Sequence, residues 1–329
     1  MKKPRNEQGV IQAIERTFRA GRSSTLLLAL GDDAALWRPS RGKETILTCD
    51  WFLEGTHFFR EKHPAGAIGW KCLARATSDI AAMGGKPSCF LLSLALPRRF
   101  TGKWLGDFLR GLRRASRSIG CEIAGGDTTP SERILISVTV LGEVHPGRAI
   151  LRSGARPGDL LYASGTLGEA ESGFEQLRRQ HGAPRTANAA LRRHLYPKPR
   201  LELGQWLAEK RLASAMMDLS DGLSSDLPRL CSGSGVGARI ETGLLPVTSE
   251  ANRHQALEFA LHGGDDYELL FTVSRRKAEL LPPHIRGVKL TCIGQITREP
   301  KILLLDEKGA LIPLRPGGWD PFRDKQAIR

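Results

Sequence analysis

Five short segments of the sequence set one or two aspartates among Gly, Ser or Thr at the end of an apolar, strand-like run. They read GDDAA at residues 31–35, LTCD at 47–50, TSDIAAMGG at 77–85, AGGDTT at 124–129 and MDLSDGLSSDL at 217–227. A carboxylate at a strand end, where a turn or helix follows, faces a cleft and is an oxygen ligand for a hard cation such as Mg2+. The repetition predicts a chain that folds around a common pool of metal ions.

Each acidic turn taken alone has a simpler explanation, because Asp-Gly and Ser-Asp pairs are more often turns or helix caps than metal ligands. The set as a whole favours metal, because so many carboxylates in one cleft would repel one another unless cations neutralised them. Mg2+ bound to the phosphates of a nucleotide is the common physiological solution. The aspartates of the set are Asp32, Asp33, Asp50, Asp79, Asp127, Asp218 and Asp221.

The chain of 329 residues is long enough for two domains, because single hydrophobic cores seldom grow beyond roughly 250 to 300 residues. In residues 1–145 the apolar pattern predicts strand, strand, helix, strand, helix, strand, strand, which is an α+β domain. Pro and Gly punctuate the sequence near Pro146, so residues 146–329 are expected to form a second, α/β domain. Strands are predicted at residues 26–30, 45–49, 88–96, 134–144, 160–163, 215–221, 238–240, 269–273 and 288–296, with a short strand leading into Gly125 and strands within 302–314 joined by a hairpin at 307–309. Helices are predicted at residues 10–18, 65–83, 101–119, 222–231 and 252–261.

The formal net charge of +14 attracts anions, which include nucleic acid, membrane surfaces and phosphorylated small molecules. Most of the positive charge is arginine spread along the whole chain, as on a solvated surface. The most basic stretch, residues 178–200, has only Tyr196 as an aromatic side chain for base stacking. A solvated helix and loop is therefore favoured over an RNA-binding element, and no nucleic-acid partner is predicted.

The six cysteines are far apart in sequence and form no C-x-x-C pair, which indicates reduced thiols and argues against a zinc site. The first residues, MKKPRNEQ, lack the apolar core of a signal peptide, and no apolar run approaches the roughly 20 residues that span a bilayer. We therefore expect a cytoplasmic protein with no membrane partner. The signatures of P-loop ATPases, Rossmann dehydrogenases, zincins and serine hydrolases are also missing from the sequence.

Seven motifs, in order along nearly the whole chain, together resemble the thiamine-monophosphate kinase family, and none of them carries the resemblance alone. They are GDDAA at residues 31–35, TCD with EGTHF within 48–58, SDIAAMG at 78–84, GGDTT at 125–129, RSGARPGD at 152–159, DLSDGL at 218–223 and GGDDYEL at 263–269. The resemblance implies the two-domain fold of aminoimidazole ribonucleotide synthetase. In that fold the N-terminal domain has a mixed sheet that pairs in a homodimer, and a C-terminal α/β domain closes the active-site cleft.

The resemblance also implies the reaction of ATP with thiamine monophosphate to give ADP and thiamine diphosphate, with several Mg2+ ions as cofactors. The implied Mg2+ ligands are Asp33, Thr48, Cys49 through its backbone carbonyl, Asp50, Asp79, Asp127, Asp218 and Asp221. The implied ATP contacts are Gly126, Asp127, Arg152 and Ser220, and the implied contacts of thiamine monophosphate are His57, Asp265 and Trp319. No residue is assigned as a general base, because a phosphate monoester with a second pKa of about 6 is already a nucleophile at neutral pH.

The chain departs from the family pattern at four positions. Cys49 stands where Thr is usual, Ala76 where Asn is usual, Asp265 where Glu is usual and Pro321 where His is usual. Two alternatives stay open from the sequence. One is another ATP-using enzyme of the same superfamily, and the other is a basic nucleic-acid-binding protein that has kept the fold and lost turnover. His57 also has a structural alternative, as a loop histidine with a hydrogen bond to its own loop.

Overall fold

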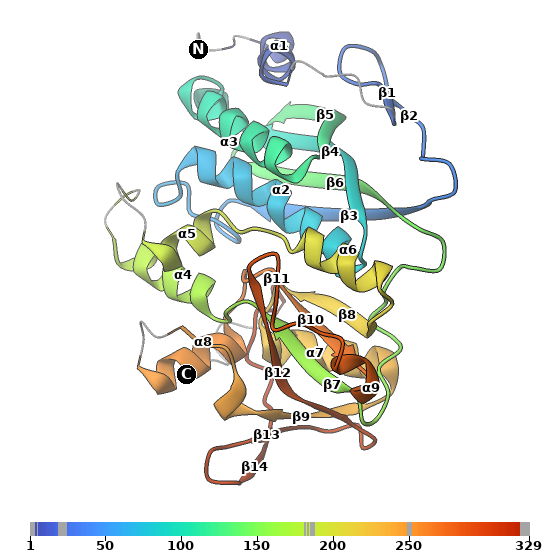
Figure 1. The fold of residues 1–329 in the computed structure, drawn as a ribbon. Coiled ribbons are helices and arrows are strands. Elements are labelled where there is room, and N and C mark those ends of the chain that lie inside the picture. The colour runs from blue at the N-terminus through green and yellow to red at the C-terminus, as the bar shows by residue number, and fades with distance from the viewer. Residues whose placement is uncertain are drawn as a thin grey trace. The chain divides into compact units, whose positions relative to one another are not determined.

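The computed structural model describes residues 4, 6–18, 25–180, 182, 184, 188–248 and 252–322. The chain divides into two compact units, coloured mainly blue to green and green to red in Figure 1. The first unit comprises residues 1–149, 176–187 and 195–201, and the second comprises residues 150–175, 188–194 and 202–329. The expected boundary between residues 145 and 146 stays a prediction about which parts of the chain fold independently. Part of the basic stretch at residues 178–200 lies outside the described residues.

The first unit is built on a four-stranded sheet in the order β3-β6-β4-β5. The strands are β3 (Glu44–Leu53), β4 (Lys86–Leu96), β5 (Glu122–Pro130) and β6 (Leu135–Val144). β6 pairs antiparallel with β3 and β4, whereas β4 and β5 are parallel, so the sheet is mixed. The remaining elements are α1 (Glu7–Thr17), β1 (Leu26–Leu28), β2 (Leu36–Trp37), α2 (Ala65–Ala82), η1 (Arg98–Phe100) and α3 (Lys103–Ile119).

Helices α2 and α3 pack closely because glycines stand where they meet. A Cβ atom added to Gly69 would lie 2.1 Å from the Phe108 carbonyl oxygen, and one added to Gly111 would lie 1.9 Å from that of Gly66. No side chain fits at either point, so the two backbones approach directly. α2 also packs on β3, β4 and β6, and together these elements bury one apolar core. That core covers one face of the four-stranded sheet.

Along β3 the side chains alternate between the two faces of the sheet, as a period of two requires. Ile46 and Phe52 are buried in the core, whereas Leu47 and Trp51 are 66% and 56% exposed on the opposite face. The small β1-β2 sheet contributes to a separate apolar cluster with Cys89 of β4. The first unit therefore has one face of its sheet under helices and carries exposed apolar side chains on the other.

The second unit is built on an eight-stranded sheet in the order β14-β13-β9-β12-β7-β10-β8, with β11 paired to β12. Its strands are β7 (Leu160–Ser164), β8 (Ala213–Leu219), β9 (Gly237–Glu241), β10 (Glu268–Val273), β11 (His284–Ile285), β12 (Val288–Thr297), β13 (Ile302–Leu305) and β14 (Leu311–Pro313). The later helices of the chain are α4 (Glu169–Arg179), α5 (Ala189–Leu195), α6 (Leu201–Glu209), α7 (Leu223–Ser234), η2 (Thr242–Leu244), α8 (Arg253–His262) and α9 (Arg275–Ala278). The predicted mixed α/β fold class is confirmed.

Within the part of the chain that the structure describes, no helix combines the length and apolar character needed to cross a bilayer. The six cysteines are all free thiols, as their spacing predicts.

Candidate active site

Two of the predicted acidic segments of the first unit line the same cleft, although Asp127 lies within β5 and not, as was predicted, in a turn after a strand. The cleft has a volume of about 660 Å3, and its wall includes Asp33 after β1 and the β5 residues Gly126 and Asp127. Apolar side chains, among them Trp37 and Leu91, line other parts of it. The structure thus brings together two of the predicted Mg2+ ligands and a predicted ATP contact, beside an apolar wall.

Gly126 is a position that only glycine can occupy. Its φ of +153° is in the region that favours glycine, and a Cβ atom would lie 1.9 Å from the Leu92 carbonyl oxygen of β4. The next residue, Asp127, accepts a hydrogen bond from the backbone N–H of Thr128 at 2.8 Å through its Oδ1 atom. Asp127 is exposed. The close approach of β4 therefore requires glycine here, directly beside an exposed carboxylate that lines the cleft.

A second group of predicted ligands lies where β3 meets α2. Thr48 donates from Oγ1 to Oδ2 of Asp79 at 2.5 Å, and Arg75 donates from Nε to Oδ2 of Asp50 at 3.2 Å. Thr48 and Asp50 are two residues apart on β3, and Arg75 and Asp79 are four apart on α2, so each pair shares one face of its element. The structure therefore brings together three of the residues expected to bind Mg2+, with a guanidinium on one of them.

Cys49 does not join that group through its side chain. It lies between Thr48 and Asp50 on β3, so its side chain is on the other face, where Sγ is 3.3 Å from Oγ of Ser137. The period of two along a strand is a sequence signal that predicts this orientation. The Cys49 side chain is therefore not a ligand beside Asp50, and the metal contact of its backbone carbonyl stays a prediction.

His57 lies in the loop that follows β3. The Nδ1 atom of its ring accepts a hydrogen bond from the backbone N–H of Leu53 at 3.0 Å. The backbone N–H of His57 donates to the Leu53 carbonyl at 2.9 Å. The imidazole ring packs near the Phe52 ring, with 5.9 Å between centroids. The ring is therefore fixed on the loop by its own backbone.

The DLSDGL turn of the second unit connects β8 to α7. Asp218 at the end of β8 is 3% exposed, and Asp221 forms an ion pair with Arg229 at 2.6 Å. A further carboxylate, Asp226, accepts hydrogen bonds from the backbone N–H groups of Ser220 and Asp221 at 3.1 and 3.0 Å. The shape of this turn thus depends on an aspartate in the first turn of α7.

Asp226 was not among the residues predicted from the sequence. It is fully buried, and Arg229 also contacts it at 2.8 Å. Burial, and next the charge of Asp221, raise the pKa of Asp226 to about 7. A buried Asp needs a hydrogen-bond partner, but the surrounding sequence pattern does not show that this residue is buried. Its partner is the turn that carries Ser220.

Two more predicted substrate contacts lie against the same turn. Trp319 donates its backbone N–H to the Asp221 carbonyl at 2.8 Å, and Asp265 donates its backbone N–H to the Ser220 carbonyl at 2.8 Å. Trp319 is 43% exposed. The second unit therefore gathers Ser220, Asp221, Asp265 and Trp319 in one place, although they are up to 99 residues apart in sequence (319 − 220).

The Asp265 side chain is held by its neighbours. Its Oδ1 atom accepts a hydrogen bond from the Tyr267 hydroxyl at 2.7 Å, and Oδ2 is 3.8 Å from Nδ1 of the buried His194. Asp265 and Tyr267 both have positive φ angles, +68° and +51°. Such backbone conformations cost on the order of 1 kcal/mol each and persist only where surrounding contacts enforce them. The Asp265 carboxylate is therefore preorganised despite being shorter than the usual Glu.

Asp266, the residue after Asp265, belongs to a network of charged side chains that was not predicted from the sequence. Asp266 accepts hydrogen bonds from the backbone N–H groups of Gly168 and Ala170 at 2.6 and 3.1 Å, and burial raises its pKa to about 8. Arg193 bridges Glu169 at 3.1 Å and the buried Glu268 at 3.0 Å. Arg193, one arginine of the basic stretch, is thus paired with carboxylates of the protein itself.

Arg152 is separate from the other predicted ATP contact of the second unit. Its carbonyl accepts a hydrogen bond from Ser234 Oγ at 3.0 Å, at the C-terminal end of α7. Ser220 precedes the N-terminal end of that helix, which is about 18 Å long at 1.5 Å per residue. The structure does not bring the backbones of Arg152 and Ser220 together.

Within each unit, the donor atoms predicted to hold metal are suited to Mg2+. They are carboxylate, hydroxyl and carbonyl oxygens, the ligands that this hard cation prefers. Among the residues that the structure describes, no three His, Cys, Asp or Glu side chains are already gathered closely enough to hold a metal ion. The residues therefore fit Mg2+ by chemistry. The carboxylates of Asp50, Asp79, Asp127 and Asp221 contact an arginine, a hydroxyl, a backbone N–H and an arginine, respectively.

Known proteins share both the sequence and the fold of this chain. The model of the AIR synthase related protein N-terminal domain matches residues 31–144, and that of the C-terminal domain matches residues 156–304. The fold and the two matches define the class, AIR synthase related proteins.

Within that class, the thiamine-monophosphate kinase of Escherichia coli K12 is 38% identical over 325 residues, covering 95% of this chain and 98% of that protein. The solved thiamine-monophosphate kinase of Stenotrophomonas maltophilia K279a has a TM-score of 0.77 and 34% identity, covering 90% of this chain and 95% of that one. A structure described as AaThiL complexed with AMPPCP and TMP has a TM-score of 0.74 and 32% identity, covering 96% and 97%. The chain belongs to the thiamine-monophosphate kinase family. The family and enzyme class predicted from the seven motifs are confirmed.

Proposed function

We propose that this protein transfers the γ-phosphoryl group of ATP directly to the phosphate of thiamine monophosphate, giving ADP and thiamine diphosphate. Membership of the family supports the reaction, and the relative solved with AMPPCP, an ATP analogue, and TMP supports both substrates. The observation in this chain that carries the proposal is the cleft of the first unit. There Asp33 and Asp127 stand beside the bare backbone of Gly126.

The reaction needs positioning and charge neutralisation more than it needs a base. The acceptor is a phosphate monoester with a second pKa of about 6, so its oxygen is already anionic and nucleophilic at neutral pH. The protein has to bring two polyanions into line against their repulsion. Bound Mg2+ would neutralise the phosphate charges. No residue is proposed as a general base.

The proposed roles follow the groups seen in each unit. In the first unit, Asp33, Asp127, Thr48, Asp50, Asp79 and the Cys49 carbonyl would hold Mg2+, Gly126 and Asp127 would contact ATP, and His57 would contact thiamine monophosphate. In the second unit, Asp218 and Asp221 would hold Mg2+, Ser220 and Arg152 would contact ATP, and Asp265 and Trp319 would contact thiamine monophosphate.

Ser220 is suited to a phosphate because its turn leads into α7. The N-terminus of a helix presents backbone N–H groups and a partial positive charge, which favour an anion. Asp226 takes the N–H groups of Ser220 and Asp221, so the turn is fixed in one shape. The Ser220 hydroxyl is then the group of this turn that we assign to a phosphate oxygen.

We also propose that the protein is a homodimer joined through the open face of the first unit's sheet. Leu47 and Trp51 of β3 and Leu91 of β4 are 66%, 56% and 37% exposed on that face. Large apolar side chains gathered on one open face of a sheet are typical of a protein–protein interface. Trp51→Arg should shift the mass in sedimentation velocity from dimer to monomer, whereas Leu280→Arg, at a residue 66% exposed in the second unit, should not. A monomeric wild type at micromolar concentration contradicts the dimer.

The proposed compartment is the cytoplasm, which six free thiols support. Nucleic acid is not proposed as a partner, because Arg193 of the basic stretch is already paired with Glu169 and Glu268. The test of the function is formation of thiamine diphosphate by purified protein with ATP, Mg2+ and thiamine monophosphate. Asp50→Asn and Asp218→Asn should each lower kcat at least about a hundredfold, in line with the loss of a group that stabilises phosphoryl transfer. An unchanged rate in both variants contradicts the site.

A further inference from the structure

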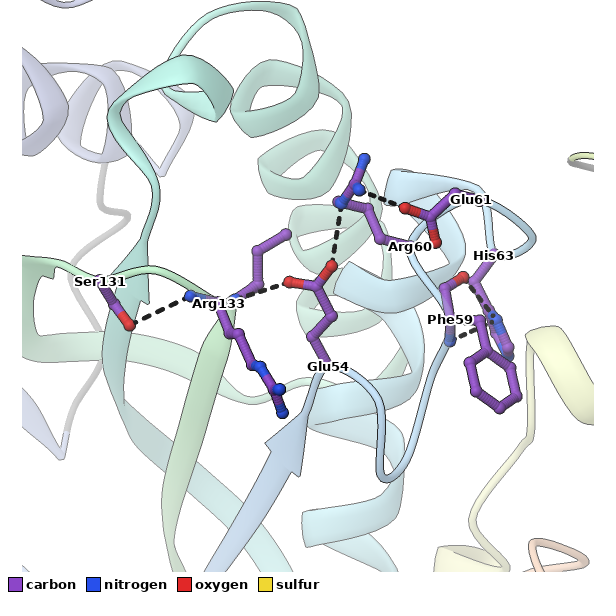
Figure 2. Close-up of polar contacts among 8 residues, drawn as sticks. Glu54, Phe59, Arg60, Glu61, His63, Ser131 and Arg133 are labelled. Carbon is purple, nitrogen blue, oxygen red and sulfur yellow. Dashed lines mark hydrogen bonds and ion pairs between the residues drawn. The ribbon is translucent and has the colours of Figure 1, made fainter.

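Glu54, the first residue after β3, holds the loop of His57 to the sheet. Its backbone N–H donates to the Ile134 carbonyl at 3.0 Å, and its Oε2 atom accepts the backbone N–H of Ile134 at 2.9 Å. The regular pairing of β3 with β6 ends at Leu53 opposite Leu135. The Glu54 carboxylate therefore adds one hydrogen bond just beyond the last pair of β3 and β6, where the loop of His57 begins (Figure 2).

The other carboxylate oxygen of Glu54 closes the loop from its far side. Arg60 donates from Nε to Oε1 of Glu54 at 2.9 Å, and its guanidinium also lies 4.5 Å from the centre of the Phe100 ring. The side chains of Glu54 and Arg60 are only 18% and 26% exposed. A charge-assisted bond shielded in this way is stronger than a surface ion pair. The segment between residues 54 and 60 is thus clamped at both ends (Figure 2).

His57 lies inside the clamped segment, and its ring nitrogens are distinguished by the loop. The Leu53 N–H points at Nδ1, so Nδ1 must be the acceptor nitrogen of a neutral imidazole. The ring proton is then on Nε2, which becomes a hydrogen-bond donor. A proton on Nδ1 would bring two donors face to face at 3.0 Å.

We propose that Glu54 is a positioning residue that fixes His57 as the Nε2–H tautomer, so that Nε2 donates a hydrogen bond to an acceptor atom of thiamine monophosphate. The identity of the substrate rests on the proposed function. The tautomer does not, because it follows from the Leu53 N–H at Nδ1, and Glu54 and Arg60 hold the loop in which that contact is made. His57 acts in binding as a donor, and Glu54 acts only through it.

The kinetic test compares Glu54→Gln with Glu61→Gln. Both changes remove one negative charge that contacts Arg60, but the Glu61 side chain is 65% exposed, whereas Glu54 also accepts the backbone N–H of Ile134. Glu54→Gln should raise KM for thiamine monophosphate about tenfold and leave kcat and KM for ATP within about threefold, as expected for losing one charge-assisted bond. Glu61→Gln should match wild type. A lower kcat together with higher KM values for both substrates, or equal effects of the two variants, overturns the positioning role.

The second test does not need turnover, and it is read on wild-type protein, with one variant used only for assignment. In wild-type protein with 15N-labelled histidine, the His57 resonances, assigned by their loss in His57→Gln, should show an unprotonated Nδ1 and a protonated Nε2. Thiamine monophosphate should then shift His57, whereas the buried His63, which is 2% exposed, should stay in place. A proton on Nδ1 of His57 in wild type overturns the proposal even if the kinase activity is confirmed. If the expected tautomer is observed but the protein has no kinase activity, the positioning of His57 by its loop is supported and the proposed function is contradicted.

Discussion

The two units hold their carboxylates in different ways. In the first unit Asp33 and Asp127 are exposed and line an open cleft, and the Asp127 carboxylate accepts the backbone N–H of its neighbour Thr128. In the second unit Asp218 and Asp226 are buried, and Arg229 contacts both Asp226 and Asp221. Exposed carboxylates keep their hydration and contribute little to stability, whereas buried ones need every partner they have. Function and stability are therefore separable in the first unit and coupled in the second.

The largest expected effect is on stability in the second unit. Asp226→Ala leaves the N–H groups of Ser220 and Asp221 and the Arg229 guanidinium without their buried acceptor, which should lower the free energy of unfolding by about 3 kcal/mol. The matched change in the first unit, Asp127→Ala, also removes an acceptor of a backbone N–H but at an exposed position. It should leave unfolding in urea close to wild type. Equal losses in the two variants would contradict the distinction.

The backbone of the first unit's cleft is a second point of comparison. Gly126→Ala should lower the free energy of unfolding by about 2 kcal/mol, because its Cβ would lie 1.9 Å from the Leu92 carbonyl at an unfavourable φ. Gly125→Ala is the control, since a Cβ there would meet only a Leu91 methyl group at 3.5 Å. Thermal and urea unfolding should separate the two. A Gly126→Ala protein as stable as Gly125→Ala shows that the close approach of β4 and β5 is wrong.

The buried carboxyl of Asp266 should make stability depend on pH. Its pKa is about 8 in the folded state against 3.8 as the ordinary value, so the folded protein keeps a proton that the unfolded chain releases. Stability from this group is present below about pH 4 and is lost as the pH rises toward 8. Between pH 5 and 8, wild type should lose more than about 1 kcal/mol relative to Asp266→Asn. A difference that is flat with pH contradicts the raised pKa.

The smallest expected effect concerns Arg229. Its guanidinium contacts Asp221 at 2.6 Å, and a second cation on the same carboxylate has to compete with it. Arg229→Gln should tighten the binding of Mn2+, used as a probe for Mg2+, about threefold, the range of a partly exposed ion pair. Arg239→Gln on the exposed side of β9 is the control and should not change it. Electron paramagnetic resonance of free Mn2+ measures both. Weaker binding in Arg229→Gln would show that the arginine assists the metal.

Sequence patterns predicted the elements better than they predicted the contacts that support the acidic segments. Apolar periodicity and glycine stops place α2, α3 and α7 close to their observed bounds, because each element buries one continuous face. Acidic residues among Gly and Ser mark the turn that carries Asp221, whereas Asp50 and Asp127 lie within β3 and β5, so the prediction that they follow a strand is wrong. These signals are local, and local signals can be read from one sequence.

The supports depend on partners far apart in the chain, so no local pattern shows them. Glu268 meets Arg193 across 75 positions, and Glu54 meets Ile134 across 80. Asp226 is close to the Ser220 turn in sequence, yet its role depends on full burial, which the pattern around it does not indicate. The orientation of the Cys49 side chain away from that of Asp50 can be predicted from the sequence, because neighbouring residues of a strand point to opposite faces of the sheet.

The central claim is that the γ-phosphoryl group of ATP passes directly to thiamine monophosphate with the help of Mg2+. The most direct measurement is incubation of the purified protein with γ-32P-labelled ATP and thiamine monophosphate, followed by separation of the thiamine phosphates. We expect the label in thiamine diphosphate when Mg2+ is present and none when the metal is chelated. Labelled inorganic phosphate with no labelled thiamine diphosphate at any Mg2+ concentration would contradict the account.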